Sequence, residues 1–282
     1  MPELPEVETV VRRLTEVLPD KIISKVEVLR QKSFQGNPAW LKNKKIEHVS
    51  RRAKMIRLHI EGKRDLLVHL KMTGQLIFVE GGKKIGGGHP TEDWINDLPG
   101  KHTRVIISFK DRSTLFFNDM RVFGWLKLVD DKQLAVEYGK YGPDVNIEEV
   151  TVDYFKKVFA HRKMPIKLAL MDNSVLAGVG NIYANEALWQ ARVHPQRPAK
   201  SLANQEWRAV HQAVKKVIDK GIEAGGTTFD GKFVDVSGLA GKYQHQLKVY
   251  GQAGKTCPRC GTMIEKVKIG GRGTQFCSHC QK

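Results

Sequence analysis

The chain has 282 residues, 41% of them hydrophobic, with 47 Lys and Arg against 30 Asp and Glu. This hydrophobic content excludes a disordered chain, and no apolar run reaches the roughly 20 residues that a membrane-spanning helix needs. The net charge of +17 favours a polyanionic partner such as nucleic acid, with a merely solvated basic surface as the alternative. The N-terminus lacks the charged and apolar regions of a signal peptide, so we expect a cytoplasmic protein without a membrane partner.

The first residues, Met1-Pro2-Glu3, carry a potential nucleophile. Pro2 is small, so removal of Met1 is expected, and it leaves a secondary amine. A typical α-amino group has a pKa near 7.7–8.0, about 2.5 units below that of lysine. An unprotonated amine attacks electrophilic carbon, and the Glu3 carboxyl beside it can exchange a proton. The alternative is an ordinary helix start, since Pro5 and Glu6 suit the first turn of a helix.

Short, β-branched apolar segments follow and predict a β-sandwich or barrel. The glycine-rich stretch 81–88 has almost no core-forming residues, and we expect a mobile loop there. The predicted strand segments are 21–32, 46–49, 55–60, 66–70, 76–79, 105–109, 115–117 and 125–129.

From about residue 130 the pattern becomes helical. We expect an N-terminal β domain over 1–135, a linker over 136–150, a helical domain over 151–245 and a cysteine-bearing segment over 246–282. The predicted helices are 152–159, 166–171, 182–189 and 205–222.

All four cysteines lie in the last 26 residues, which argues against a disulfide scaffold. Cys257 and Cys260 form one C-x2-C pair, Cys277 and Cys280 form the other, and sixteen residues separate the pairs. This spacing predicts one structural Zn²⁺ ion, because four thiolates leave no open coordination position. The residues between the pairs predict a β-hairpin with Arg272 at its tip, as a phosphate contact or as a merely solvated turn residue.

The sequence Gly178-Val179-Gly180-Asn181-Ile182-Tyr183 resembles a dinucleotide-binding loop only superficially. Tyr183 replaces the third glycine and helices flank the motif, so we expect no nucleotide cofactor. A glycine turn that opens a helix still presents backbone N–H groups to phosphate. Asn181 is therefore a candidate DNA-backbone contact, with a tight turn between packed helices as the equal alternative.

Two strand ends in the β region carry further candidates. Met72 precedes Thr73-Gly74, and Arg121 and Phe123 precede Gly124. Such apolar residues are usually core residues, but strand ends next to glycines are also where sites gather. An aromatic side chain beside a cation at a loop tip can enter between stacked bases and bend duplex DNA.

Three motifs together resemble one family along essentially the whole chain. The motifs are P-E-L-P-E-V-E-T at 2–9, G-V-G-N-I-Y-A-N-E at 178–186, and the terminal four-cysteine hairpin with G-R-G-T at 271–274. They resemble the bacterial formamidopyrimidine-DNA glycosylases, which excise oxidised purines from duplex DNA and then cut the abasic strand by β,δ-elimination. The resemblance implies an α+β fold with an N-terminal helix and β-sandwich, a helix–two-turn–helix domain and a zinc β-hairpin finger, which acts on damaged double-stranded DNA. Nothing in the sequence indicates more than a monomer.

The resemblance also implies roles for individual residues. Pro2 corresponds to the nucleophile that forms an imine with the sugar, and Glu3 to the acid that protonates the opening deoxyribose. Lys54 and Arg272 correspond to further catalytic residues, and Glu6 and Lys167 to residues that support the active site. His69, Asn181 and Arg272 correspond to phosphate contacts. Met72, Arg121 and Phe123 correspond to the side chains that fill the hole left by the extruded base. Residues 227–243 resemble the loop that closes over the extruded base.

Two alternatives compete with this interpretation. An endonuclease VIII-like enzyme shares the amine mechanism but prefers oxidised pyrimidines, and a catalytically silent zinc protein would bind kinked DNA without using Pro2 or Glu3. The stretch 81–100 is longer than the usual connection, and Met120 stands where relatives often have proline. Neither departure touches Pro2 or Glu3, so we expect the reaction to be unchanged.

Overall fold

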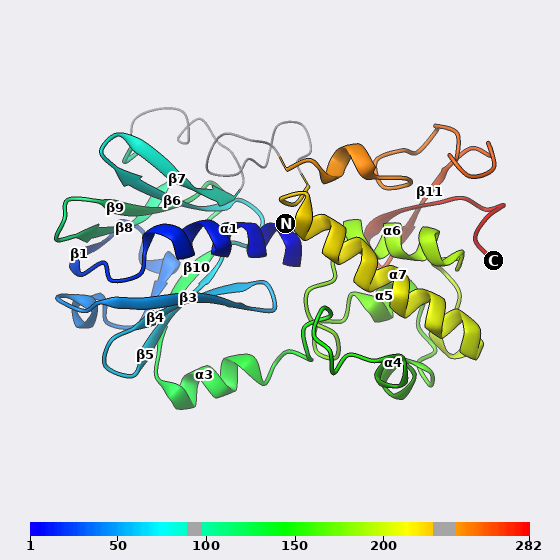
Figure 1. Ribbon diagram of the computed structural model, residues 1–282, viewed down its shortest axis with the longest axis horizontal. Coiled ribbons are helices and arrows are strands. Elements are labelled where there is room, and N and C mark those ends of the chain that lie inside the picture. The colour runs from blue at the N-terminus through cyan, green and yellow to red at the C-terminus, as the bar shows by residue number, and fades with distance from the viewer. Residues whose placement is uncertain (89–97, 228–240) are drawn as a thin grey trace. The chain divides into compact units, whose positions relative to one another are not determined.

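The fold is given by a computed structural model, which describes residues 1–88, 98–227 and 241–282. Its internal contacts divide the chain into two units (Figure 1). The first consists of Met1–Gly139 with Ala224–Lys242, and the second of Lys140–Glu223 with Tyr243–Lys282. The described residues 224–227 and 241–242, which the sequence pattern places in the helical domain, therefore group with the N-terminal unit.

The described strands of the first unit form two five-stranded sheets, in the orders β1-β8-β9-β6-β7 and β2-β10-β5-β4-β3. Neighbouring strands are antiparallel except for β2 and β10, which are parallel. The strands are β1 (Ile23–Val28), β2 (Phe34–Gln35), β3 (Ile46–Arg52), β4 (Met55–Ile60), β5 (Arg64–His69), β6 (Gly74–Glu80), β7 (Lys83–Gly88), β8 (Thr103–Phe109), β9 (Thr114–Asp119) and β10 (Trp125–Val129), with short helical turns at Gln31–Ser33 and Pro38–Leu41.

Alternating side chains from both sheets meet in one apolar core, which confirms the predicted β-sandwich. In β8, for example, Val105, Ile107 and Phe109 are buried while their neighbours are partly exposed. They join Leu58 and Val68 from the opposite sheet in the same cluster. The period of two follows from the pleat of a strand, which turns successive side chains to opposite faces.

Helix α1 (Leu4–Val17) covers the side of the sandwich where β7 and β3 are the edge strands (Figure 1). Val7, Val10 and Leu14 recur at helical spacing and are buried in the core between the sheets. This packing fixes the start of the helix, and with it the N-terminal residues. A second helix, α3 (Asp131–Tyr138), packs Leu134 against Leu67 and Val129.

The prediction of a mobile loop at 81–88 is wrong, because residues 83–88 form strand β7. The strand pairs with β6 from Glu80–Lys83 to Gln75–Gly88. Strand pairing uses backbone N–H and C=O groups, so it does not need apolar side chains. At Gly88 an added Cβ would lie 2.4 Å from the Gly74 carbonyl oxygen, so only glycine permits this close approach to β6.

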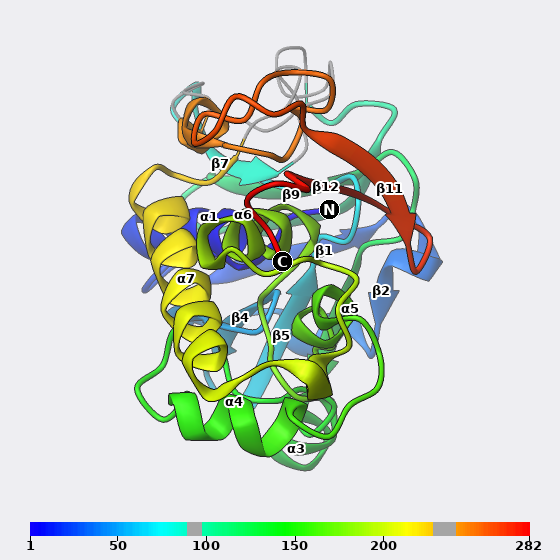
Figure 2. The same cartoon turned by 90° about the vertical axis from the view of Figure 1, so that its right-hand side faces the viewer.

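The second unit is helical and confirms the predicted helices to within a few residues (Figure 2). Tyr183 of α6 packs against Gly221 of α7, where an added Cβ would lie 2.6 Å from the ring. The missing side chain therefore lets the two helices approach closely. The helices are α4 (Val152–Phe159), α5 (Ile166–Leu170), α6 (Asn181–Ala191) and α7 (Asn204–Glu223), with short helical turns at Ala199–Ser201 and Tyr243–Gln246. Across the described residues, every helix is too short or too polar to cross a bilayer.

The chain ends in the predicted hairpin, formed by β11 (Glu265–Ile269) and β12 (Arg272–Phe276). Gly270 and Gly271 make the turn with φ of +54° and +74°, which suits glycine at both central positions. Arg272 is the first residue of β12, directly after the turn, and its side chain is exposed.

Candidate active site and nucleic-acid interface

The N-terminal residues are held at a capped helix start. Pro2 and Glu3 are buried, and Glu3 is the N-cap residue of α1. The Glu6 side chain reaches back, and its Oε2 accepts the Glu3 N–H at 2.8 Å. Such a capping box satisfies donors that would otherwise be unpaired, so it fixes the backbone of Pro2 and Glu3.

Glu6 also organises the segment that follows α7. Its Oε1 accepts the Thr227 N–H at 2.8 Å, and a Cβ on Gly226 would lie 3.1 Å from the Glu6 side chain. The Lys242 N–H donates to the Ala224 carbonyl oxygen, so the two ends of the intervening segment meet beside the start of α1. Most of the predicted lesion-closing loop (227–243) falls in 228–240, outside the described residues.

Lys54 lies in the tight turn between β3 and β4, where Ala53 has a φ of +55°. The Lys54 side chain is only 5% exposed. Arg51 fixes this turn to the first helix, because its Nε donates to Glu8 Oε2 at 2.9 Å and its Nη1 to the Ala53 carbonyl oxygen at 2.8 Å. Burial opposes ionisation of Glu8, but the hydrogen bonds and charges of Arg51 and Arg12 outweigh it and lower the pKa of Glu8. The turn bearing Lys54 is therefore tied to the helix that begins beside Glu3.

His69 ends β5 and is 6% exposed. Its Nδ1 accepts the Lys71 N–H at 3.0 Å, so the neutral ring carries its proton on Nε2. Burial, with the nearby charges of Lys71 and Lys54, lowers the pKa of His69 to about 3. At neutral pH His69 is therefore a neutral N–H donor, which can contact a phosphate oxygen without adding charge.

This neutral imidazole predicts acid sensitivity. The pKa of His69 is about 3 when folded against about 6.5 when unfolded, so between these pH values the unfolded chain binds more protons. The stabilisation is complete above about pH 6.5 and is lost as the pH falls. Between pH 7.5 and pH 5.0 we expect the free energy of unfolding to fall by about 2 kcal/mol through His69.

Denaturant unfolding of the wild type and of His69→Asn at both pH values measures this effect. The asparagine keeps an acceptor near the position of Nδ1 but does not titrate, so the fall should shrink by about 2 kcal/mol. An equal fall in both proteins would contradict the assignment.

Met72, Arg121 and Phe123 lie on two loops at the same end of one sheet, beside the neighbouring strands β6 and β9. β6 begins two residues after Met72, and its first residue, Gly74, pairs with Asp119 at the end of β9. Met72 and Phe123 are 39% and 48% exposed, and the Arg121 guanidinium lies 4.6 Å from the centre of the Phe123 ring. Met72 and Phe123 line the same open pocket of about 470 Å³. The structure thus places two exposed apolar side chains beside a cation, as an intercalating wedge requires.

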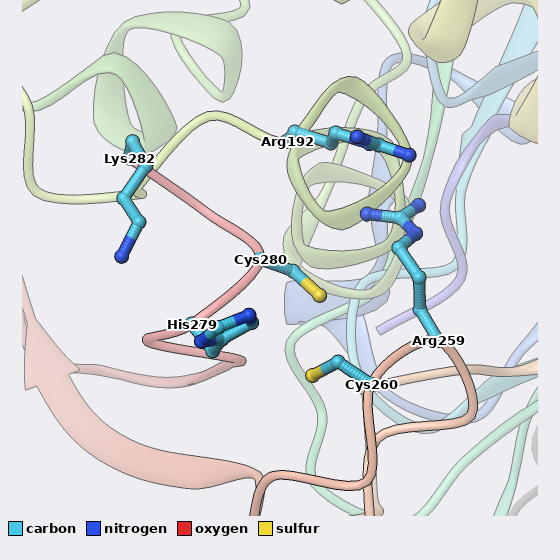
Figure 3. A pocket seen from close by; sticks show the side chains of 6 residues that line it. All are labelled: Arg192, Arg259, Cys260, His279, Cys280 and Lys282. Atoms are coloured by element: carbon cyan, nitrogen blue, oxygen red, sulfur yellow. The ribbon is translucent and has the colours of Figure 1, made fainter.

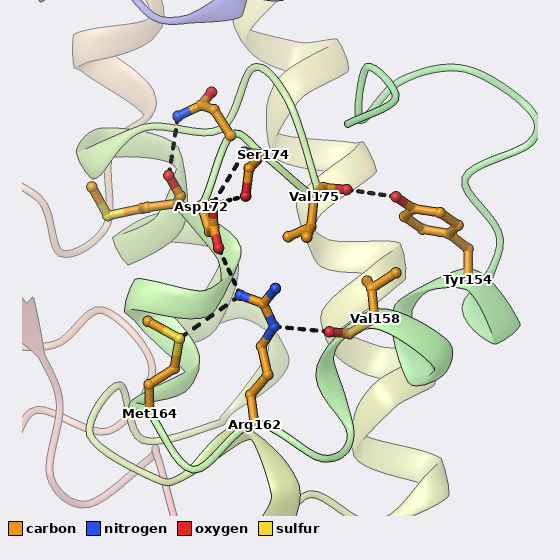
Figure 4. Close-up of polar contacts among 9 residues, drawn as sticks. Tyr154, Val158, Arg162, Met164, Asp172, Ser174 and Val175 are labelled. Atoms are coloured by element: carbon orange, nitrogen blue, oxygen red, sulfur yellow. Dashed lines mark hydrogen bonds and ion pairs between the residues drawn. The ribbon is translucent and has the colours of Figure 1, made fainter. Parts of the chain in front are cut away.

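In the second unit, side-chain hydrogen bonds hold the connection between α5 and α6 (Figure 4). Asp172 closes the first turn by accepting from the Ser174 N–H at 3.1 Å, and the Arg162 guanidinium donates to Asp172 at 2.6 Å. The Tyr154 hydroxyl donates to the Val175 carbonyl oxygen at 2.6 Å. The Gly178 N–H donates to Asn173 Oδ1 at 3.2 Å, three residues before α6 begins.

Asn181 and Lys167 both bind the backbone of the C-terminal hairpin. Asn181 Nδ2 and Lys167 Nζ donate to the Gly273 carbonyl oxygen, each at 3.1 Å. Lys167 also donates to Thr274 Oγ1 at 2.7 Å, and its side chain is fully buried. Lys167 therefore supports the strand that carries Arg272, and the resemblance alone gave no sign of this buried contact.

The four cysteine sulfurs form a compact group. All four Sγ atoms lie within 4.8 Å of one another, with Cys257 to Cys280 at 4.0 Å and Cys260 to Cys277 at 3.5 Å. Tetrahedral zinc with Zn–S bonds near 2.3 Å requires separations of about 3.8 Å, so four thiolates fit one ion. A pocket of about 530 Å³ opens beside Cys260 and Cys280 and is lined by His279 and the cationic side chains of Arg192, Arg259 and Lys282 (Figure 3).

Glu186 is a structural residue to which the sequence alone assigned no role, although it is the last residue of the motif at 178–186. It is 3% exposed, and its carboxyl oxygens accept the N–H groups of Lys248, Val249 and Tyr250 at 2.8–2.9 Å. Glu186 thereby holds the chain that leads into the zinc segment against α6. The available signal was an acidic residue among the small and apolar residues of that helix.

The structure thus gathers the predicted residues into two separate groups. Eight lie in the first unit, namely Pro2, Glu3, Glu6, Lys54, His69, Met72, Arg121 and Phe123. Lys167, Asn181, Arg272 and the four cysteines lie in the second. Exposed apolar side chains beside cations and a four-cysteine hairpin, on a chain of charge +17, are typical of a zinc-containing nucleic-acid-binding protein.

Comparison with known proteins gives the family. Family models described as the formamidopyrimidine-DNA glycosylase N-terminal domain, its H2TH domain and the zinc finger found in FPG and IleRS match residues 1–126, 141–232 and 254–282. Formamidopyrimidine-DNA glycosylases of Desulforamulus reducens and Lactobacillus delbrueckii subsp. bulgaricus are 38% and 39% identical to this chain, with 100% of the chain and 99–100% of the relatives covered.

Solved structures agree with this assignment. A Lactococcus lactis Fpg complex with abasic-site DNA and another with N7-benzyl-Fapy-dG DNA are each 30% identical to this chain, with full coverage of both chains and TM-scores of 0.87 and 0.88. The chain belongs to the formamidopyrimidine-DNA glycosylase family. Membership also confirms the predicted α+β fold and the single structural zinc site.

Proposed function

We propose that the protein is a base-excision repair enzyme that removes oxidised purines, 8-oxoguanine and formamidopyrimidines, from double-stranded DNA and then cleaves the abasic strand. The observation that carries the proposal is the buried Pro2–Glu3 pair at the capped start of α1, in a member of this family. Damaged duplex DNA is the proposed partner, and the Lactococcus lactis relatives were solved with DNA containing Fapy-dG or an abasic site.

The proposed reaction begins at the Pro2 nitrogen after removal of Met1. The free amine has a typical pKa near 7.7–8.0, so a useful fraction is unprotonated at neutral pH. Its lone pair attacks C1′ of the damaged nucleoside, the N-glycosidic bond breaks, and the base leaves with a proton. The Glu3 carboxyl protonates the ring oxygen as the deoxyribose opens, which leaves an iminium between Pro2 and the sugar.

Elimination then follows from the iminium. The cationic nitrogen withdraws electrons, so a C2′ proton is lost and the 3′-phosphate leaves, after which the 5′-phosphate leaves in a second elimination. In this mechanism Lys54 and Arg272 contact the phosphates and the lesion, and His69 and Asn181 donate to backbone phosphates. Glu6 and Lys167 act through others: Glu6 holds the Glu3 backbone, and Lys167 holds the strand bearing Arg272.

Access to C1′ requires the damaged nucleotide to leave the base stack. We propose that Met72 and Phe123 fill the resulting hole and that Arg121 faces the unpaired cytosine. Unstacking costs a few kcal/mol, less at a damaged pair, and inserted side chains with phosphate contacts offset it. We propose a monomer that acts on chromosomal DNA in the cytoplasm and uses no nucleotide cofactor. When bound, Zn²⁺ fixes the hairpin through Cys257, Cys260, Cys277 and Cys280.

Borohydride reduction tests the proposal directly. A duplex with 8-oxoguanine opposite cytosine should give a covalent protein–DNA band with the wild type, and Pro2→Gly should lose most of it. A tetrahydrofuran analogue in place of the lesion is the matched control, since it has no aldehyde oxidation state to trap. Absence of the band for wild-type protein shown to lack Met1 would overturn the purine assignment.

A second candidate substrate is an oxidised pyrimidine, because one Lactococcus lactis Fpg structure holds DNA with such a base. Excision rates on 8-oxoguanine and thymine glycol in the same sequence separate the two. A clear preference for thymine glycol would favour the endonuclease VIII-like specificity.

A further inference from the structure

Asp119 joins the two loops that carry Met72, Arg121 and Phe123. It is the last residue of β9 and is 0% exposed. Its Oδ1 accepts from the Thr73 hydroxyl and from the Arg121 N–H at 3.2 Å, and its Oδ2 accepts the Gly124 N–H at 2.6 Å. One buried carboxyl group therefore contacts both ends of the Arg121–Phe123 loop and the residue next to Met72.

The loop that Asp119 holds has an unfavourable backbone conformation. Val122 has a φ of +53°, a region that β-branched residues rarely adopt. Such a conformation persists only where the surroundings impose it. Val122 lies between Arg121 and Phe123, and the Arg121 guanidinium stacks on the Phe123 ring, 4.6 Å from its centre.

Gly124 allows the carboxyl group to reach this loop. A Cβ at Gly124 would lie 2.8 Å from the Phe117 ring, 3.0 Å from the His69 carbonyl oxygen and 3.1 Å from Asp119 Oδ2. Without a side chain, the Gly124 backbone comes close enough to donate to Asp119. The Thr73 hydroxyl completes the connection, because it also accepts the Arg121 N–H at 3.1 Å.

We propose that Asp119 is a positioning residue that locks Met72, Arg121 and Phe123 into one rigid unit before DNA arrives. Exposed side chains that must enter the base stack bind better when they are already ordered, because less conformational entropy is lost on insertion. Asp119 touches no substrate in this proposal and acts through the three side chains. The inference rests on the proposed function, since it gives the three side chains the task of filling the hole.

Asp119→Asn tests the proposal, because the amide nitrogen cannot accept a hydrogen bond and the carboxyl contacts cannot all be kept. Two rates are compared: excision of 8-oxoguanine from a duplex, which needs the hole to be filled, and cleavage of a single-stranded abasic oligonucleotide, which does not. We expect the ratio of duplex to single-strand rates to fall by about tenfold to a hundredfold, the scale on which small misplacements act. The preference for cytosine over adenine opposite the lesion should fall with it.

The matched control is Asp111→Asn, which makes the same change three residues before β9 begins. There Asp111 accepts a hydrogen bond from Ser113 and forms an ion pair with Lys21. It should leave the ratio within about twofold of the wild type.

Wild-type excision of 8-oxoguanine decides the proposed function independently of these variants. If the wild type is active and Asp119→Asn keeps both the ratio and the opposite-base preference, the positioning role is refuted. An equal fall in both rates would also refute it, because Asp119 would then support only the folding of the unit.

Discussion

Protein that retains Met1 or a tag in front of Pro2 is expected to lose strand cleavage by about 10³-fold or more, the scale on which loss of a nucleophile acts in other enzymes. The reason is electronic. In a peptide bond the nitrogen lone pair is delocalised into the carbonyl group, so the Pro2 nitrogen no longer attacks carbon.

The measurement compares the tagged protein before and after a protease exposes Pro2, on the same 8-oxoguanine duplex. Affinity for duplex containing a tetrahydrofuran abasic analogue serves as the control and should change little, because the proposed phosphate contacts and wedge lie on other residues. Mass spectrometry of the intact protein confirms which N-terminus is present. Full turnover by a verified extended protein would rule out the amine mechanism.

Loss of the zinc site is expected to produce the second large effect. Cys277→Ala removes one of four ligands from a fully buried position, and metal binding in such sites is coupled to folding. We expect affinity for the tetrahydrofuran duplex to fall by at least about tenfold, together with loss of one equivalent of bound zinc. The effect extends beyond the hairpin, because Lys167 is fully buried and donates to Gly273 and Thr274 of β12.

Ser278→Ala is the matched control for this variant. Ser278 is the exposed neighbour of Cys277, so its replacement should keep both zinc and DNA affinity. Zinc content is read by elemental analysis, and hairpin order by hydrogen exchange of β11 and β12. Unchanged zinc and affinity in Cys277→Ala would contradict the four-cysteine site. The β-sandwich has a separate apolar core, so its unfolding midpoint should stay close to that of the wild type.

The two glycine-rich stretches of the chain illustrate how far local sequence predicts backbone structure. Gly270 and Gly271 between alternating residues correctly predict a hairpin, because a tight turn between paired strands needs positive φ at both positions. Residues 83–88 have a similar composition but form a strand. Their partner, β6, supplies the backbone hydrogen bonds, and no property of the stretch itself reports that partner.

Most helices and strands, the zinc ligands and the nucleophilic amine of Pro2 could be predicted from residue types at short spacing. Which side chains bind to which distant segments became evident only in the folded chain. Asp119 and Glu186 look like ordinary polar residues in the sequence, yet each is buried and binds backbone groups of another segment. Lys167 likewise reaches the hairpin more than a hundred residues away. Such pairings depend on burial and on contacts distant in sequence, which local patterns do not encode.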